Sequence, residues 1–456
     1  MQLDLSLPIF SDYIPVDVKR IPYGISDYRR LLEEDGYYVD KTPYIRLIEV
    51  SPLYLFLLRP RRIGKSLLLS MLYHYYDVNN QERFEQLFGD TYIGQNPTPH
   101  RTSYLTMCFN FSMVSPELSE VRESFTETVN NEINDFLTRY ERFYSAEDVA
   151  YIKESNSIQG RLQRIFYHAT RHQLKTYLFI DEYDNFTNTI LANQGVLSYH
   201  KLTHGAGFFR HFFNLLKGLT GGQISGLTRL FITGVSPVTM DDVTSGFNIG
   251  HDISQERNFN EMVGLTENEV IPMLHYYHDH NMLPLTIDET MAFMKRWYNN
   301  YYFGVDARTS MFNSDMVFHF LLRASQKGQL PDELIDPNIR TDYSKLRHLM
   351  TVDRQLQERL RAEGAEFARD PAKVNEAAKN PAKEEPKPVE EHKLNGNFSE
   401  LKKIIQAGET ISTINGSFPV EALLERTNFI SLLYYMGFLT VAGNVEGDPL
   451  LKIPNR

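Results

Sequence analysis

The sequence predicts an α/β fold in which a parallel sheet is flanked by helices. Apolar runs of strand length alternate with segments whose apolar residues recur at helical spacing, which is typical of parallel sheets covered on both faces. The run at 53–58 leads through a basic turn into an apolar helix, and the run at 176–180 ends in two acidic residues. These two junctions indicate where the chemistry of the chain is concentrated.

The expected elements can be placed in chain order. Buried strands are expected at 53–58, 104–112, 176–181 and 227–234. Ser26 is a suitable N-cap and Pro43 suits a first helical turn, so helices are expected to begin at both places. The expected helices lie at 26–34, from Thr42 onward, and at 65–77, 116–142, 157–172 and 206–218.

The second half of the chain changes character. Three amphipathic helical patterns, at 266–280, 286–303 and 314–325, predict a helical lid or adaptor. Residues 370–393 contain four prolines and no aromatic, Leu or Ile residue, so a disordered or inserted linker is expected there. The tail reads as helix, helix, strand, turn and strand, which resembles a winged helix. The predicted units are 1–260 (nucleotide-binding domain), 261–352 (helical), 353–393 (linker) and 394–456 (winged-helix-like).

The composition limits the classes of function. The net charge of −11 argues against a protein that coats nucleic acid, because phosphate binding requires an excess of Lys and Arg. The single cysteine, Cys108, excludes an internal disulfide and a Cys-rich zinc site, which fits a reducing compartment. No apolar run approaches the ~20 residues of a membrane span, and the N-terminus lacks a signal-peptide pattern. We therefore expect a cytoplasmic protein without a membrane partner.

A phosphate-binding loop is predicted at RPRRIGKS, residues 59–66. The segment fits the P-loop (Walker A) pattern GxxxxGK[ST] except that Arg59 replaces the first glycine. Gly64 lets the backbone approach a phosphate, Lys65 reaches the β- and γ-phosphates, and the Ser66 hydroxyl is a ligand for Mg²⁺. The expected nucleotide-binding residues are Arg61, Arg62, Ile63, Gly64, Lys65, Ser66 and Leu67. The alternative interpretation is an ordinary basic turn between strand and helix.

An acidic pair follows the third strand. Four apolar residues and then Asp181 and Glu182 form a Walker B arrangement, in which Asp181 holds Mg²⁺ and Glu182 activates the attacking water. Asp184 is expected to be structural or a helix N-cap. Thr233, at the end of the fourth strand, is a candidate sensor of the γ-phosphate, and Arg257 is a candidate arginine acting on the transition state in cis or in trans. A plain strand-end threonine and a solvated surface arginine are the competing interpretations.

Several segments together resemble the bacterial AAA-ATPase-like proteins, whose members often carry a C-terminal PD-(D/E)XK nuclease-like domain. The resemblance rests on segments that include LLRPRRIGKSLLLSML, LFIDEYD, LFITGVSPVTMDDVTSGFNIG and WYNNYYFG. It covers most of residues 18–455 except about 354–392, and Arg59 is similar to what this family has in place of the glycine. It implies ATP as the nucleotide, a P-loop core of the additional-strand type, and a nucleotide base near Tyr28 and residues 37–41.

Three functions are compatible with these features. The first is an ATP hydrolase that acts as a nucleotide-driven switch or motor for a partner or fused effector, with a protein effector or further copies of the chain as partners. The second is a non-hydrolysing nucleotide-binding scaffold whose winged helix binds DNA or protein. The third, a small-molecule kinase, lacks an evident acceptor motif. No further D…ExK-type site is visible, so nuclease activity is not expected.

Overall fold

The computed structural model describes residues 18–221, 226–244, 249–327, 334, 336 and 396–454. The predicted linker at 353–393 lies outside the described residues. Within the described ranges no helix combines the length and the apolar character that crossing a membrane would require.

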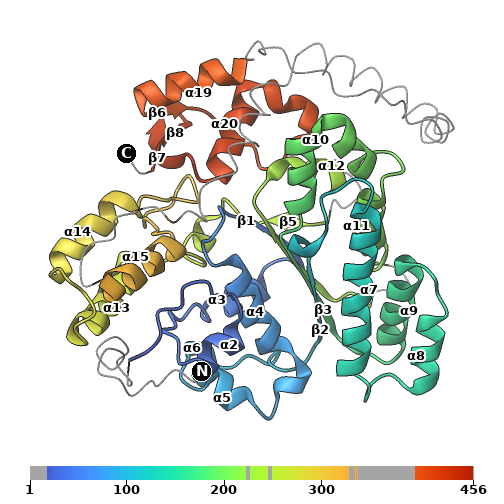
Figure 1. The fold of residues 1–456 in the computed structure, drawn as a ribbon. Coiled ribbons are helices and arrows are strands. Elements are labelled where there is room, and N and C mark those ends of the chain that lie inside the picture. The colour runs from blue at the N-terminus through green and yellow to red at the C-terminus, as the bar shows by residue number, and fades with distance from the viewer. Residues whose placement is uncertain are drawn as a thin grey trace, which may run out of the picture.

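A five-stranded parallel sheet forms the centre of the molecule (Figure 1). It consists of β1 (Tyr54–Leu58), β2 (Leu105–Asn110), β3 (Thr176–Asp181), β4 (Arg229–Gly234) and β5 (His251–Asp252), in the order β2-β3-β4-β1-β5. The α/β prediction is therefore confirmed. Strand β4 is inserted between β1, which leads into the phosphate loop, and β3, which ends at Asp181. This is the order that a core of the additional-strand type implies.

One face of the sheet is covered by the first helices of the chain. Side chains of alternate strand residues, such as Leu57 and Phe179, pack there against Leu68 and Leu72 of the helix that follows the phosphate loop. The helices on this face are α2 (Tyr28–Glu33), α3 (Tyr44–Val50), α4 (Lys65–Tyr76), α5 (Phe84–Phe88) and α6 (Tyr92–Gln95).

The other face is covered by the helices that come later. The strand residues between those of the first face, such as Leu58 and Ile180, point toward this layer. It contains α7 (Val121–Arg139), α8 (Ala146–Lys153), α9 (Ile158–Arg171), α10 (Asn185–Thr203), α11 (Phe208–Gly218) and α12 (Pro237–Thr244). Helix α10 was not expected from the sequence. It is interrupted at Gly195, whose φ of 81° lies in the left-handed region that glycine adopts readily.

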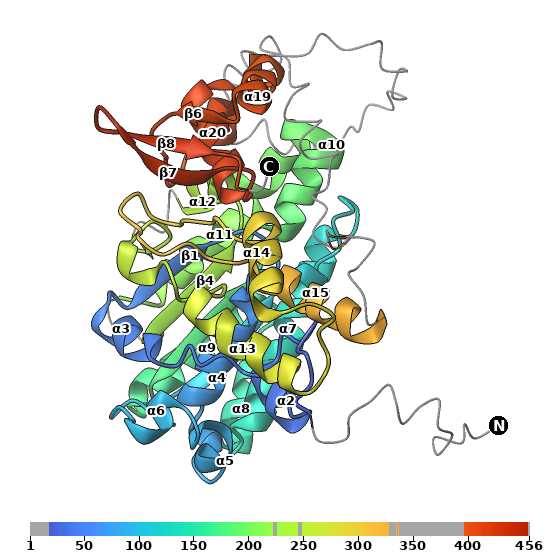
Figure 2. The ribbon, with the colours of Figure 1, turned by 90° about the vertical axis from the view of Figure 1, so that its left-hand side faces the viewer.

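A separate helical unit follows the sheet. It is built from α13 (Glu267–Asp279), α14 (Ile287–Trp297) and α15 (Ser314–Lys327), which share one apolar cluster (Figure 2). Helix α14 ends earlier than the expected residue 303. Asn300 has a φ of 77°, and Tyr301 pairs with Met311 in an antiparallel bridge, so the aromatic run after Trp297 forms a turn and an extended segment.

The C-terminal unit combines helices with a small antiparallel sheet. It contains α19 (Gly396–Ala407), β6 (Glu409–Ile411), α20 (Arg426–Tyr435), β7 (Thr440–Val445) and β8 (Asp448–Lys452), with sheet order β6-β8-β7. Glu446 and Gly447 both have positive φ, as a two-residue hairpin turn of the I′ type requires. Short 3-10 helices complete the described fold: η1 (Val78–Asn80), η2 (Phe111–Met113), η3 (Arg257–Phe259) and η5 (Val420–Leu424).

Candidate functional site

A cavity of about 380 Å³ lies at the carboxyl ends of the parallel strands. Ligands of open α/β sheets bind at this edge, because loops that follow neighbouring strands meet there. Residues 62–68 of the phosphate loop and Asp181 and Glu182 line it together. Further walls come from the segments 22–41 and 262–265 and from the start of α15.

The phosphate loop has a backbone conformation that suits the binding of an anion. Arg62 and Gly64 have φ values of 63° and 101°, so the backbone makes a turn in the left-handed region before α4 begins at Lys65. Alternating backbone conformations of this kind orient successive N–H groups toward one point, which makes a site for anions. The first turn of α4 adds further free N–H groups and the positive end of the helix dipole.

The carbonyl groups of the same loop are held on the opposite side by later parts of the chain. Asn313 Nδ2 donates to Arg61 O at 3.4 Å, the N–H of Asp315 to Arg62 O at 3.3 Å, and the N–H of Gly264 to Ile63 O at 2.8 Å. The Ser314 hydroxyl also donates to Arg62 O at 3.4 Å. Because α15 begins at Ser314, the helical unit is joined directly to the backbone of the phosphate loop.

Lys65 carries a buried amine that faces acidic groups. Its side chain is only 6% exposed, and Nζ donates to Arg59 O at 3.0 Å and to Pro60 O at 2.8 Å. Burial lowers the pKa of this amine, while Asp181 and Glu182 act in the opposite direction. A phosphate at the mouth of the loop would replace the two weak carbonyl partners with anionic oxygen atoms.

Arg59 stands where the P-loop pattern has glycine, and its side chain is buried away from the cavity. The guanidinium donates to the carbonyl oxygens of Leu58 (3.0 Å), Phe259 (3.1 Å) and Ser254. It also lies over the ring of Phe303, with 4.4 Å between the guanidinium carbon and the ring centroid. Burial lowers its pKa to about 10, so the group remains charged at neutral pH. Arg59 therefore supports the turn from beneath and does not contact the phosphate site.

Asp181 is positioned by the two strands beside it. Asn110 of β2 pairs with it in register, and Thr233 of β4 donates its hydroxyl to Asp181 Oδ1 at 2.5 Å. The backbone N–H of Glu182 also donates to Oδ1, at 3.0 Å. Both of these bonds use the same oxygen, which leaves Oδ2 as a ligand for a cation.

Glu182 has a backbone conformation that is uncommon for its residue type. Its φ is 49°, in the left-handed region that non-glycine residues seldom adopt outside turns and functional sites. Burial raises the pKa of its carboxyl, and the neighbouring charge of Asp181 raises it further. A carboxylate with a raised pKa, on the wall of a cavity, has the properties of a general base.

The segment 22–41 covers the cavity from the N-terminal side. Tyr37, Tyr38 and Val39 line it, and Lys41 is held by Glu269 of α13 at 2.7 Å and by Glu261 O at 2.9 Å. Tyr28 is fully buried and donates to Leu87 O at 2.7 Å, so it stands behind this wall. The aromatic and apolar character of the segment suits a nucleotide base.

The structure brings most of the expected site residues together. Arg62, Ile63, Gly64, Lys65, Ser66, Leu67, Asp181 and Glu182 all line the cavity. Three other residues do not. Arg61 is exposed and donates to Asn185 at 3.3 Å, Thr233 is fully buried against Asp181, and Arg257 is exposed on η3. Asp184 is buried and accepts from the N–H groups of Val235 and Ser236, which is the structural role expected for it.

Other lining residues were not anticipated. Asn110 is the last residue of β2 and Ser112 lies in η2, and a polar residue at the end of an apolar strand was the available signal. Ser314 and Asp315 come from a helix that begins about 250 residues after the loop, and no local pattern connects them to it. Burial and the neighbouring Asp336 raise the pKa of Asp315 to about 7, although Arg62 acts against this.

Comparison with known proteins gives one family match, one relative and one solved structure. The model of the AAA-ATPase-like family, described as a predicted AAA-ATPase, matches residues 22–244. A relative from Azotobacter chroococcum mcd 1, described as an uncharacterized protein in the vnfD 5' region, is 26% identical over 309 residues, which are 66% of this chain and 52% of the relative. The chain thus spans about half the length of that relative. The crystal structure of Cdc6p from Pyrobaculum aerophilum superposes with a TM-score of 0.31 at 13% identity, over 98% of this chain and 94% of the other.

Replacing Arg59 by glycine should destabilise the protein even though it completes the P-loop pattern. Arg59→Gly removes a donor from three carbonyl groups, of which Phe259 O keeps a second donor, the N–H of Met262 at 3.4 Å. Each carbonyl group left without a donor costs about 1–3 kcal/mol, so the free energy of unfolding should fall by at least ~2 kcal/mol. Urea unfolding followed by circular dichroism measures the change. Arg61→Gly is the matched control, since Arg61 is exposed; equal stability of the two variants would contradict the role given to Arg59.

Proposed function

We propose, on the premise that residues 22–244 belong to the AAA-ATPase-like family, that this chain binds ATP in the cavity at the sheet edge and hydrolyses it. The observation that carries the proposal is the convergence of Lys65, Asp181 and Glu182 on one cavity beside the N-terminus of α4. A basic turn alone, or an acidic strand end alone, would not indicate a nucleotide site. A site for a triphosphate requires both in the same cavity.

Binding of the triphosphate follows from the loop conformation. The N–H groups of residues 63–66 and the dipole of α4 attract the β-phosphate, and Lys65 Nζ moves from the carbonyl groups of Arg59 and Pro60 to the phosphate oxygens. The base lies toward Tyr37 and Tyr38 on the opposite wall.

The cavity also has the donor set that Mg²⁺ prefers. Magnesium is a hard cation that takes oxygen ligands and keeps several waters. Ser66 Oγ and Asp181 Oδ2 would hold it, because Ser66 lines the cavity and both hydrogen bonds to Asp181 use Oδ1. When bound, the ion would neutralise charge on the phosphate oxygens.

Hydrolysis needs a group that takes a proton from water. Glu182 extends from the turn after β3 into the same cavity, next to Asp181, and its raised pKa favours proton uptake. Thr233 supports this geometry indirectly, because its hydroxyl fixes Asp181. Its role is thus to position the metal ligand, in place of the expected contact with the γ-phosphate.

The contacts of the helical unit support a switch driven by the nucleotide. The loop whose N–H groups bind phosphate presents its carbonyl groups to Asn313, Ser314 and Asp315. A rotation of these peptide units on phosphate binding would alter the hydrogen bonds to α15. The helical unit would then report the state of the nucleotide to a protein effector.

Substitution of Lys65 and Glu182 should separate binding from hydrolysis. Lys65→Ala removes a charge-assisted contact with phosphate, which should weaken ATP binding about 10- to 100-fold and reduce turnover. Glu182→Gln keeps the size of the side chain but cannot accept a proton, so turnover should fall at least ~100-fold while ATP still binds. Phosphate release and calorimetric titration with ATP measure the two effects. Unchanged turnover in both variants would refute the proposed ATPase.

The pH dependence of turnover should report the protonation of Glu182. Its pKa is raised above the ordinary value of 4.5, so the carboxyl takes up a proton at a higher pH than a free glutamate does. As the pH falls through this raised pKa, kcat should decrease, because a protonated carboxyl cannot act as a base. ATP affinity measured over the same range is the control. The acid limb should be absent from the residual activity of Glu182→Gln.

Substitution of Arg257 tests whether this arginine acts on a nucleotide that a neighbouring subunit binds. It is exposed and outside the cavity, so it would reach a nucleotide held by a neighbouring copy of the chain. Arg257→Ala should then reduce turnover, and mixing it with Lys65→Ala should restore part of the activity, since one variant supplies Lys65 and the other Arg257. A mixture of Glu182→Gln and Lys65→Ala should show no recovery. Full turnover of Arg257→Ala would exclude this role.

A further inference from the structure

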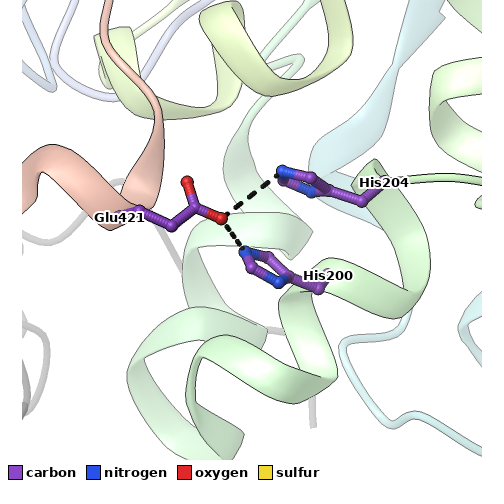
Figure 3. A group of neighbouring side chains, drawn as sticks. All are labelled: His200, His204 and Glu421. Carbon is purple, nitrogen blue, oxygen red and sulfur yellow. Dashed lines mark ion pairs between the residues drawn. The ribbon is translucent and has the colours of Figure 1, made fainter. Parts of the chain in front are cut away.

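A cluster of metal-ligating side chains lies far along the chain from the phosphate loop. His200 and His204 come from the second half of α10, and Glu421 from the first turn of η5 (Figure 3). One ligand atom of each residue lies within 4.8 Å of the other two. Residues four apart on a helix lie on the same face, so both imidazoles point toward the carboxylate. We propose that these three residues bind a divalent transition-metal ion, with Zn²⁺ as the probe.

The distances fit a tetrahedral ion after a small movement. With metal–ligand bonds of about 2.0–2.1 Å, neighbouring ligand atoms of a tetrahedral zinc site lie about 3.3 Å apart. His204 Nε2 lies 3.6 Å from Glu421 Oε1 and 3.4 Å from Asp242 Oδ1, while His200 Nε2 lies 2.7 Å from Glu421 Oε1. The pair of His200 and Glu421 would have to open by about 0.6 Å to reach this spacing. Asp242 lies next to His204, at the edge of the cluster.

The ring nitrogen of His200 has no hydrogen bond that satisfies it. Nε2 is buried and close to Glu421 Oε1, but the two atoms do not meet in the geometry of a hydrogen bond to any described residue. Buried polar atoms are almost always hydrogen-bonded, and the ion pair of this nitrogen with Glu421 does not have that geometry. A metal ion between the nitrogen and the carboxylate would give the nitrogen a bonding partner.

The tautomer of His204 is set for ligation. The Thr203 hydroxyl uses its proton to bond Tyr199 O at 3.1 Å and therefore accepts from His204 Nδ1 at 2.9 Å. With the proton on Nδ1, the lone pair of Nε2 faces Glu421 and Asp242. Metal-ligating histidines commonly use the other ring nitrogen in this way.

The charges around the cluster favour a cation. Asp242 is held by a 2.7 Å hydrogen bond from the hydroxyl of Tyr199. Asp241 is a further acidic neighbour of Glu421, and Arg210 is the basic group that acts on His204. Imidazole and carboxylate groups are among the ligands that zinc prefers.

The ion would fasten the C-terminal unit to the sheet domain. The apolar cluster next to the site includes Tyr199 and Val238 from one side and Phe418, Val420 and Leu423 from the other. Glu421 lies within this contact, and the two histidines lie on α10. A bound metal ion would therefore link the two sides of the contact through coordination bonds. The site is therefore structural, and it is independent of the nucleotide.

Zinc titration of the full chain tests the site. Protein freed of tags and stripped with a chelator should bind one Zn²⁺ per chain by calorimetry, and Zn²⁺ should raise its melting temperature. His204→Asn and Glu421→Gln should weaken this binding more than about tenfold and abolish the thermal shift. His251→Gln is the matched control, because His251 forms an exposed pair with Glu256 away from the cluster.

Three possible results of the titration support or overturn the proposed zinc site. Stoichiometric binding that is lost in both cluster variants and kept in His251→Gln supports the site, and zinc–nitrogen distances of about 2.0 Å by X-ray absorption would add the ligand identity. No binding by the unaltered chain overturns the proposal. Equal binding by the unaltered chain and by Glu421→Gln, which conserves volume and keeps the fold testable without metal, overturns it as well.

Discussion

The hydrogen bonds on the outer side of the phosphate loop are the constraint on which the site depends. A peptide unit has its N–H and C=O on opposite sides, so fixing the carbonyl groups also fixes the direction of the N–H groups. Gly264, Asn313 and Asp315 hold the carbonyl groups of Ile63, Arg61 and Arg62. The cavity therefore presents donors before any ligand arrives, and the segments that hold the loop come from outside the sheet domain.

Two basic residues of this loop, six positions apart, are both buried but have different roles. Arg59 and Lys65 are both buried and both bond to backbone carbonyl groups. The two terminal nitrogens of the Arg59 guanidinium reach three carbonyl acceptors, and an aromatic ring lies beneath the group, although Nε has no hydrogen-bond partner among the described residues. The amine of Lys65 has three N–H donors and two neutral carbonyl acceptors, so it gains more from an anion. The buried Arg59 therefore has a structural role, whereas the buried Lys65 is available to bind an anionic ligand.

Much of the core could be predicted from the sequence, because its signals are local. Strands β1–β4 are short apolar runs, and the turn at Gly64 and the acids after β3 are adjacent in sequence to the strands that position them. Strand β5 has two residues and carries no pattern of its own. Helix α10 was missed because Gly195 interrupts its helical pattern. The aromatic run after Trp297 suggested a longer helix, and the left-handed conformation of Asn300 ends that pattern. In each case tertiary contacts determined a local secondary structure that the propensity of the residues did not specify.

The residues that distant parts of the chain contribute around the site could not be predicted from the sequence. Ser314 and Glu421 each lie more than two hundred residues from their partners, Arg62 and His200, and only the folded chain brings them together. These two contacts differ in kind. The helical unit meets the sheet domain through hydrogen bonds of 3.3–3.4 Å to the carbonyl groups of the phosphate loop and through the ion pair of Lys41 with Glu269 at 2.7 Å. The C-terminal unit meets it through an apolar cluster and a set of metal-ligating groups. The helical unit therefore contacts the phosphate loop itself, whereas the C-terminal unit contacts the sheet domain at residues that do not line the cavity.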